Sequence, residues 1–184
     1  EVDILEKLYN VYPRFSEGYG ELGSQRPYAA ELHTGNERHA FTENSAHIPL
    51  YEGKMVDQYD YRAKEYISGR GRSATWRDLD FNSQEKEIRP QWHIDPGKLD
   101  HRRLSRISHY RIGFCNVTSP TNQRSLIATM IPRGAICGDP VPTLLLETNT
   151  VSSHFFWLSI ANSVATDFIA RKKVALHMTY PIVD

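Results

Sequence analysis

Two alternating segments followed by a long apolar stripe constrain most strongly what this chain can fold into. Apolar and polar side chains alternate in residues 108–117, and residues 126–131 form a second segment typical of a strand. Residues 150–173 then place apolar side chains on a wide stripe with helical spacing, ending in basic residues that suit a helix C-terminus. The sequence therefore predicts an α+β fold in which a mixed or antiparallel sheet packs against a long C-terminal helix.

Weaker signals fill in the rest of the chain. Short strands are expected at residues 28–33, 91–94, 135–137 and 141–146. Helical spacing of apolar residues favours a short helix at residues 2–9, and residues 98–106 also have helical character. The length of 184 residues suits one domain, and no linker or internal repeat divides it. We therefore expect residues 1–184 to form a single domain.

Motif searches exclude several classes of site. Two cysteines cannot build a disulfide-dense scaffold or a four-cysteine zinc site, and none of the eight histidines belongs to a zinc-binding motif. Residues 18–23 match the dinucleotide-binding fingerprint in letters, but no strand precedes them and Pro27 interrupts a following helix. No motif for an activated nucleophile is present. We expect no metal or cofactor in this chain, and a stand-alone small-molecule enzyme is the least favoured function.

The same features bear on the compartment. The low cysteine content fits a reducing environment, and the first 30 residues show no basic start followed by an apolar run. The most apolar stretch, residues 155–170, contains Asn162 and Asp167 and is shorter than the ~20 residues that span a bilayer. The sequence therefore predicts a cytoplasmic protein with no membrane partner.

The balanced total charge, 22 basic against 22 acidic residues, hides a local excess. Residues 98–133 contain seven basic residues and one acidic residue, Asp100. A local excess of positive charge favours phosphate binding, because each neutralised phosphate releases condensed counterions. A solvated surface patch with no partner is an equally good interpretation of the charge alone.

The strongest functional signal comes from motifs that follow one another along the chain. Residues 31–41 read ELHTGNERHAF, and residues 49–62 read PLYEGKMVDQYDYR. Residues 110–114 read YRIGF, and residues 121–128 read TNQRSLIA. Residues 161–173 contain NS, DFIAR and a final lysine. In this order and spacing they resemble the region after the catalytic domain of large bacterial adenine-specific DNA methyltransferases of restriction-modification and phage-defence systems.

The resemblance is to the TaqI-like C-terminal specificity region of the class IIG-like enzymes, and it implies a DNA target-recognition domain. Such a domain binds double-stranded DNA and presents it to a methyltransferase catalytic domain, which holds the extruded adenine and S-adenosylmethionine. The catalytic NPPY-type motif and the S-adenosylmethionine motif do not occur in this chain. The resemblance therefore implies a parent enzyme that methylates DNA and a chain that does not methylate alone. Cys115 and Asn116 stand where the family usually has Arg-Asp, and Gln123 stands where it has glutamate.

Side chains that read base edges or hold phosphates supply the candidate contacts. Arginine reads guanine and amides read adenine, whereas lysine and arginine near phosphates position the duplex. The candidate DNA-binding residues are Lys54, Gln58, Arg62, Arg70, Arg72, Arg111, Thr121, Asn122, Gln123, Arg124, Lys172 and Lys173.

Each candidate also has a structural interpretation. Lys54, Gln58 and Arg62 form one polar edge if their segment is helical, but they can equally make internal ion pairs or turn contacts. Arg111 lies opposite Tyr110 and Ile112, on a strand face that is either solvated or turned toward DNA. A capped turn explains residues 121–124, a surface loop explains Arg70 and Arg72, and helix-end charge explains Lys172 and Lys173. A competing function is a protein–protein docking module of a methyltransferase complex, in which the sheet and the C-terminal helix bind the catalytic domain or another subunit.

Overall fold

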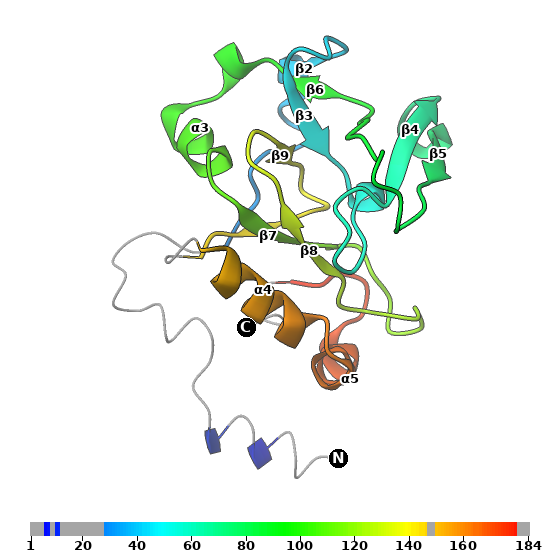
Figure 1. Ribbon diagram of the computed structural model, residues 1–184, viewed down its shortest axis with the longest axis vertical. Coiled ribbons are helices and arrows are strands. Elements are labelled where there is room, and N and C mark those ends of the chain that lie inside the picture. Colours follow the sequence, from blue (N-terminus) through cyan, green and yellow to red (C-terminus); the bar gives the residue numbers. More distant parts are fainter. Residues whose placement is uncertain (1–5, 8–9, 12–27, 147–149, 180–184) are drawn as a thin grey trace.

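Two four-stranded sheets and a separate hairpin form the framework of the protein (Figure 1). The computed structural model describes residues 6–7, 10–11, 28–146 and 150–179. The first sheet is antiparallel throughout, in the order β1 (Tyr28–Ala29), β10 (Thr143–Leu144), β7 (Arg111–Phe114) and β8 (Ala128–Ile131). Of the predicted strands, the alternating segment at 108–117 became β7, and the segment at 126–131 became β8.

The second sheet is mixed. Its order is β2 (Phe41–Thr42), β6 (His93–Ile94), β3 (Ile48–Tyr51) and β9 (Ile136–Cys137). β3 and β9 are parallel, and the other pairs are antiparallel. The hairpin consists of β4 (Lys64–Ser68) and β5 (Thr75–Asp78). The α+β class with a mixed or antiparallel sheet is therefore confirmed, but β2, β3 and the hairpin had no predicted counterpart.

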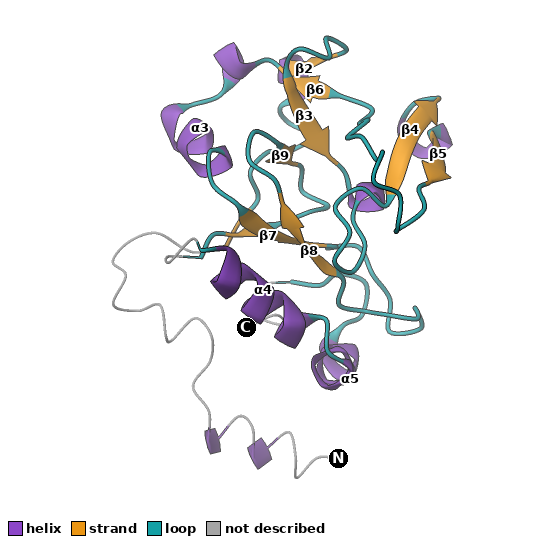
Figure 2. Ribbon diagram, viewed as in Figure 1, coloured by secondary structure: helices purple, strands orange, loops and turns teal. Residues whose placement is uncertain are grey.

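Helices cover one face of the first sheet. α4 (Val151–Ala161) lies across β7 and β8, and α5 (Val164–Lys173) follows it (Figure 2). A shorter helix, α3 (His101–Ile107), precedes β7. Single 3-10 turns occur at η1 (Arg38–Ala40), η2 (Gly53–Met55), η3 (Gly71–Ser73) and η4 (Pro96–Lys98). Most of the helix predicted at residues 2–9, and all of residues 18–23, lie outside the described residues.

The prediction of one long C-terminal helix is wrong in one respect. Thr150 caps α4 by accepting a hydrogen bond from the Ser153 N–H. The helix then stops at Asn162, and Ser163 caps a second helix by accepting from the Thr166 N–H. Asn and Ser prefer cap positions to helix interiors, because their short side chains compete for backbone hydrogen bonds. This break turns α5 toward the loop that connects β7 and β8.

The main core lies between the first sheet and the two C-terminal helices. Ile112, Phe114, Leu126, Leu144 and Leu158 are fully buried there. Burial of each such side chain contributes roughly 1.5–3 kcal/mol, so this core is a large share of the stability. The core holds β8, and with it the loop before β8, in a fixed place.

Candidate nucleic-acid interface

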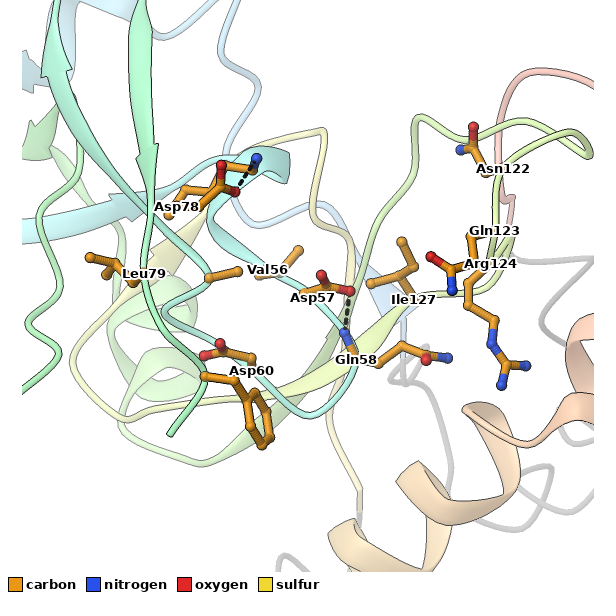
Figure 3. Close-up of a pocket in the computed structure, with 13 residues that line it drawn as sticks. Val56, Asp57, Gln58, Asp60, Asp78, Leu79, Asn122, Gln123, Arg124 and Ile127 are labelled. Atoms are coloured by element: carbon orange, nitrogen blue, oxygen red, sulfur yellow. Dashed lines mark hydrogen bonds and ion pairs between the residues drawn. The ribbon is translucent and has the colours of Figure 1, made fainter. Parts of the chain in front are cut away.

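A cavity of about 720 Å³ brings together two of the motifs that the sequence singled out. Gln58 comes from the turn after the PLYEGKM motif, and Asn122, Gln123 and Arg124 come from the loop between β7 and β8. Figure 3 shows these side chains on the wall of the cavity, together with acidic residues of the first segment. The cavity therefore brings candidate residues from both segments together, which the sequence alone did not predict.

The Gln58 side of the cavity is a tight two-residue turn. The backbones of Asp57 and Asp60 exchange two hydrogen bonds, with N···O distances of 2.8 and 3.0 Å. Tyr59 N–H donates to the Ala128 carbonyl at 3.2 Å, which fixes the turn against the start of β8. The Nε2 atom of Gln58 is buried and has no hydrogen-bond partner among the described residues. An unpaired buried amide donor costs free energy.

The opposite side is held by one buried carboxylate of α5. Asp167 accepts hydrogen bonds from the backbone N–H groups of Ser125 at 2.7 Å and Leu126 at 2.9 Å. It also accepts from Arg171 Nε at 2.9 Å and lies 4.0 Å from Arg124 Nη1. Charge-assisted bonds of this kind are about twice as strong as neutral ones. Asp167 therefore positions the loop that carries Asn122, Gln123 and Arg124.

Two further side chains of the C-terminal helices brace the same loop. Arg171 donates to the carbonyls of Pro120 at 2.9 Å and Gln123 at 2.5 Å. Asn162 accepts from Ala128 N–H at 3.1 Å and donates to the Ala128 carbonyl at 2.8 Å. The residues of the NS and DFIAR motifs thus act as loop anchors. Composition and periodicity gave no sign of this role, and only the spacing of the motif along the chain marked these residues.

The charges around the cavity largely cancel. Lys64 Nζ lies 2.5 Å from Asp78 Oδ1, and Lys86 forms a buried ion pair with Asp60. Arg124 is the cation on the loop side of the cavity. Hydrogen-bond donors and acceptors therefore dominate the lining, which suits base edges better than phosphate groups.

The prediction that Arg111 lies on a solvated or DNA-facing strand face is wrong. Its side chain is fully buried, with 0% exposure, and its Nε lies 2.7 Å from Oε1 of Glu31. Its Nη1 donates to the His109 carbonyl at 2.6 Å, and its Nη2 donates to the Ala135 carbonyl at 2.5 Å. The second sheet and the segment at residue 31 cover this face of β7. The buried arginine therefore links β7 to both of them through its bonds to Glu31 and to the Ala135 carbonyl. Arg111 cannot contact DNA in this fold.

The basic excess of residues 98–133 is also partly neutralised. Arg103 lies 2.6 Å from Glu37 Oε1, and Arg106 lies 3.4 Å from Glu31 Oε1. With Arg111, and with Arg124 at 4.0 Å from Asp167, four of the seven cations therefore lie against carboxylates within the fold. The exposed cations of this region are Lys98, Arg102 and Arg133.

The helical edge proposed for Lys54, Gln58 and Arg62 does not form. Residues Gly53–Met55 make a single 3-10 turn, and the chain then enters the turn that carries Gln58. Lys54 is exposed outside the lining of the cavity. Arg62 donates to the Lys86 carbonyl and does not line the cavity, so it has a structural role.

Three candidates, Arg70, Lys172 and Lys173, lie elsewhere on the surface. Arg70 pairs with Glu43 at 3.0 Å and lies over the ring of Trp92. Arg72 belongs to η3, and its side chain lies outside the described part of the molecule. The exposed Lys172 and Lys173 end α5 and do not line the cavity.

Thr121 lies on the correct loop, but it is not part of the cavity wall. Its hydroxyl is 2.8 Å from the hydroxyl of Ser119, on the exposed outer side of the loop. Asn122 donates to Thr118 Oγ1 at 3.4 Å, and its side chain is otherwise exposed. The loop is therefore a hydrogen-bonded turn that still presents polar groups outward.

The residues described contain no group of three or more potential metal ligands among His, Cys, Asp and Glu. Both cysteines are free, and burial raises the pKa of the Cys115 thiol to about 11, so Cys115 is not an activated nucleophile. Within the described residues, no helix is long and apolar enough to cross a bilayer. No protein-family model, curated protein or solved structure matches the chain.

Proposed function

We propose that the chain is the DNA target-recognition domain of a site-specific adenine-N6 DNA methyltransferase. The observation that carries the proposal is the shared cavity of Gln58, Asn122, Gln123 and Arg124, because it unites two motifs that are far apart in the sequence. Both motifs were singled out by their resemblance to this family. Braces from β8 and α5 hold their backbones in place, as precise recognition requires.

The side chains at the cavity match what base edges offer in the major groove. The amides of Gln58, Asn122 and Gln123 supply paired donors and acceptors, which suit adenine. Arg124 supplies the donors that suit guanine, and the exposed carboxylate of Asp57 suits the amino group of cytosine. Exposed cations outside the cavity, such as Lys54 and Arg133, would contact phosphates.

The methylation step belongs to another part of the parent enzyme. Adenine N6 is unreachable for transfer chemistry while the base is stacked, so the base must be extruded into a catalytic pocket. S-adenosylmethionine would bind in that catalytic domain, which is the partner of this chain together with double-stranded DNA. This chain would select the site and align the duplex.

Loss of Gln123 is expected to reduce discrimination between DNA sequences. A good bidentate contact contributes about 1–3 kcal/mol of discrimination, so Gln123→Ala should lower the ratio of specific to nonspecific affinity by about 5-fold to about 150-fold. The ratio is measured with a duplex selected from a random pool and a scrambled duplex at one salt concentration. Gln84→Ala, which changes an exposed amide outside the cavity, is the matched control and should leave the ratio unchanged.

Salt dependence separates this function from its rivals. Affinity for duplex DNA should fall steeply as the salt concentration rises, because the release of counterions from the phosphates on binding becomes less favourable in high salt. If the wild-type chain shows no duplex binding at low salt, or if Gln123→Ala and Gln84→Ala behave alike, the proposed function is wrong.

A second candidate function is a protein–protein docking module of a methyltransferase complex. The observation that favours it is the outer face of α4, where Phe155, Phe156 and Ile160 are 53%, 69% and 50% exposed. Val164 and Phe168 of α5 extend this apolar surface, which we call the α4–α5 face. Clustered exposed apolar residues commonly mark a protein interface.

The α4–α5 face can be tested separately from DNA binding. Phe156→Asp should leave the free energy of unfolding within about 0.5 kcal/mol of wild type, because the Phe156 side chain is mostly exposed and contributes little to the core. It should leave duplex affinity within about twofold of wild type, but abolish co-purification with the parent's catalytic domain. If Phe156→Asp retains full co-purification, the face is not the docking surface.

A further inference from the structure

Tyr59 has a backbone conformation that its residue type disfavours. Its φ is +60°. Among the residues that the structure describes, every other residue with a positive φ is a glycine. It occupies the second position of the two-residue turn between Asp57 and Asp60. Turn positions with positive φ are usually taken by glycine or asparagine, because a bulky side chain is strained there. The backbone conformation therefore disfavours an aromatic residue at this position.

The side chain of Tyr59 is presented at the surface beside the candidate interface. It is 48% exposed, directly follows Gln58 in the turn, and is fixed in place by its N–H bond to the Ala128 carbonyl. Tyr59 itself does not line the cavity, but another aromatic side chain, Phe81, does and is 62% exposed. Strained residues that the structure holds firmly are enriched at functional sites.

We propose that Tyr59 is a stacking residue that inserts beside the bases read by Gln58 and stacks on an opened base step of the bound DNA. The inference rests on the proposed function, since it takes the cavity as the DNA-reading surface. Aromatic rings stack on every base, so the contact would position the duplex without reading its sequence. In a duplex, a side chain can stack in this way only where a base step is partly open.

The charges of the turn favour a base over a phosphate as the partner of Tyr59. Asp57 flanks the ring along the chain and its carboxylate repels phosphate groups, whereas Asp60 is buried and paired with Lys86. Asp57 is exposed, so this repulsion acts at the surface where the ring lies. A contact through the uncharged aromatic face is compatible with both carboxylates.

Distorted duplexes test the inference without knowledge of the target sequence. A single-base bulge has already lost part of its stacking, so a stacking side chain binds it more tightly than an intact duplex. We expect the wild-type chain to prefer a bulged random-sequence duplex over the intact duplex by about tenfold in Kd. Tyr59→Asn should lose most of this preference. Tyr59→Phe should keep the preference.

Stability measurements separate stacking from a structural role. Asparagine tolerates the left-handed conformation, so Tyr59→Asn should have a Tm no lower than wild type. Phe155→Asn, which removes an exposed aromatic from α4, is the matched control and should keep the preference for the bulge. If wild type binds intact duplex but shows no preference, or if Tyr59→Asn keeps the preference, the inference is wrong and the proposed function stands. If no duplex binds at all, both fall.

Discussion

Replacement of Arg111 by alanine is expected to lower the free energy of unfolding by about 3–5 kcal/mol, because it removes the nearer of the two cations that pair with the buried Glu31 carboxylate, the other being Arg106, and empties a fully buried site. Glu31 is itself buried, and its Oε2 also accepts from the Cys137 N–H at 2.9 Å. The pair thus joins the segment at residue 31 to strands of both sheets. Urea unfolding followed by circular dichroism measures the loss.

Arg133→Ala is the matched control for this substitution. Arg133 is exposed and lies over the ring of Tyr110, so its removal should cost less than about 1 kcal/mol. An Arg111→Ala chain that loses less than 1 kcal/mol, or that stays fully folded and loses only DNA affinity, would contradict the buried structural role.

Replacement of Asp167 by asparagine should cost about 2–4 kcal/mol and weaken DNA binding together with stability. The carboxylate accepts from Ser125, Leu126 and Arg171, and charge-assisted hydrogen bonds are worth about 1.5–3 kcal/mol each. An asparagine amide can accept fewer of these bonds and carries no charge to balance Arg171. The loop that bears Gln123 would then lose its anchor, so the sequence preference should also fall.

The cost of Asp167→Asn depends on pH in a definite direction. Burial opposes the charged form of Asp167, but hydrogen bonds from Leu126, Arg171 and Ser125 outweigh burial and lower its pKa. A lowered pKa stabilises the fold at pH values above the unfolded-state pKa, which is about 3.9, and this contribution disappears as pH falls through the folded-state pKa. The stability difference between wild type and Asp167→Asn should therefore be full at pH 7 and shrink below pH 4. A difference that grows on acidification would contradict this role.

The fold could be predicted from the sequence where periodicity was strong. The alternation at residues 108–117 gave β7, and the apolar spacing after Thr150 gave the helices on the first sheet. β3 escaped prediction because Ile48–Tyr51 has no alternation and is buried through pairing with β6 and β9, which come later in the chain. Such long-range pairing overrides local signals.

The sequence predicted four of the residues that line the candidate site, but it did not predict the residues that support them. The motifs identified Gln58 and residues 122–124, and the structure places them around one cavity. Arg111 was misjudged because a charged residue on an alternating strand normally faces water, and nothing nearby in the sequence shows that Glu31 lies against it. The anchoring roles of Asp167 and Arg171 likewise depend on contacts more than 40 residues away along the chain.

Backbone hydrogen exchange of the chain, with and without a selected DNA duplex, tests the central claim most directly. We predict that DNA slows exchange in residues 57–60 and 119–128, the two segments that carry the cavity, and leaves the outer face of α4 unchanged. Protection confined to α4 and α5, or no change in either segment at saturating duplex, would contradict DNA recognition by this cavity.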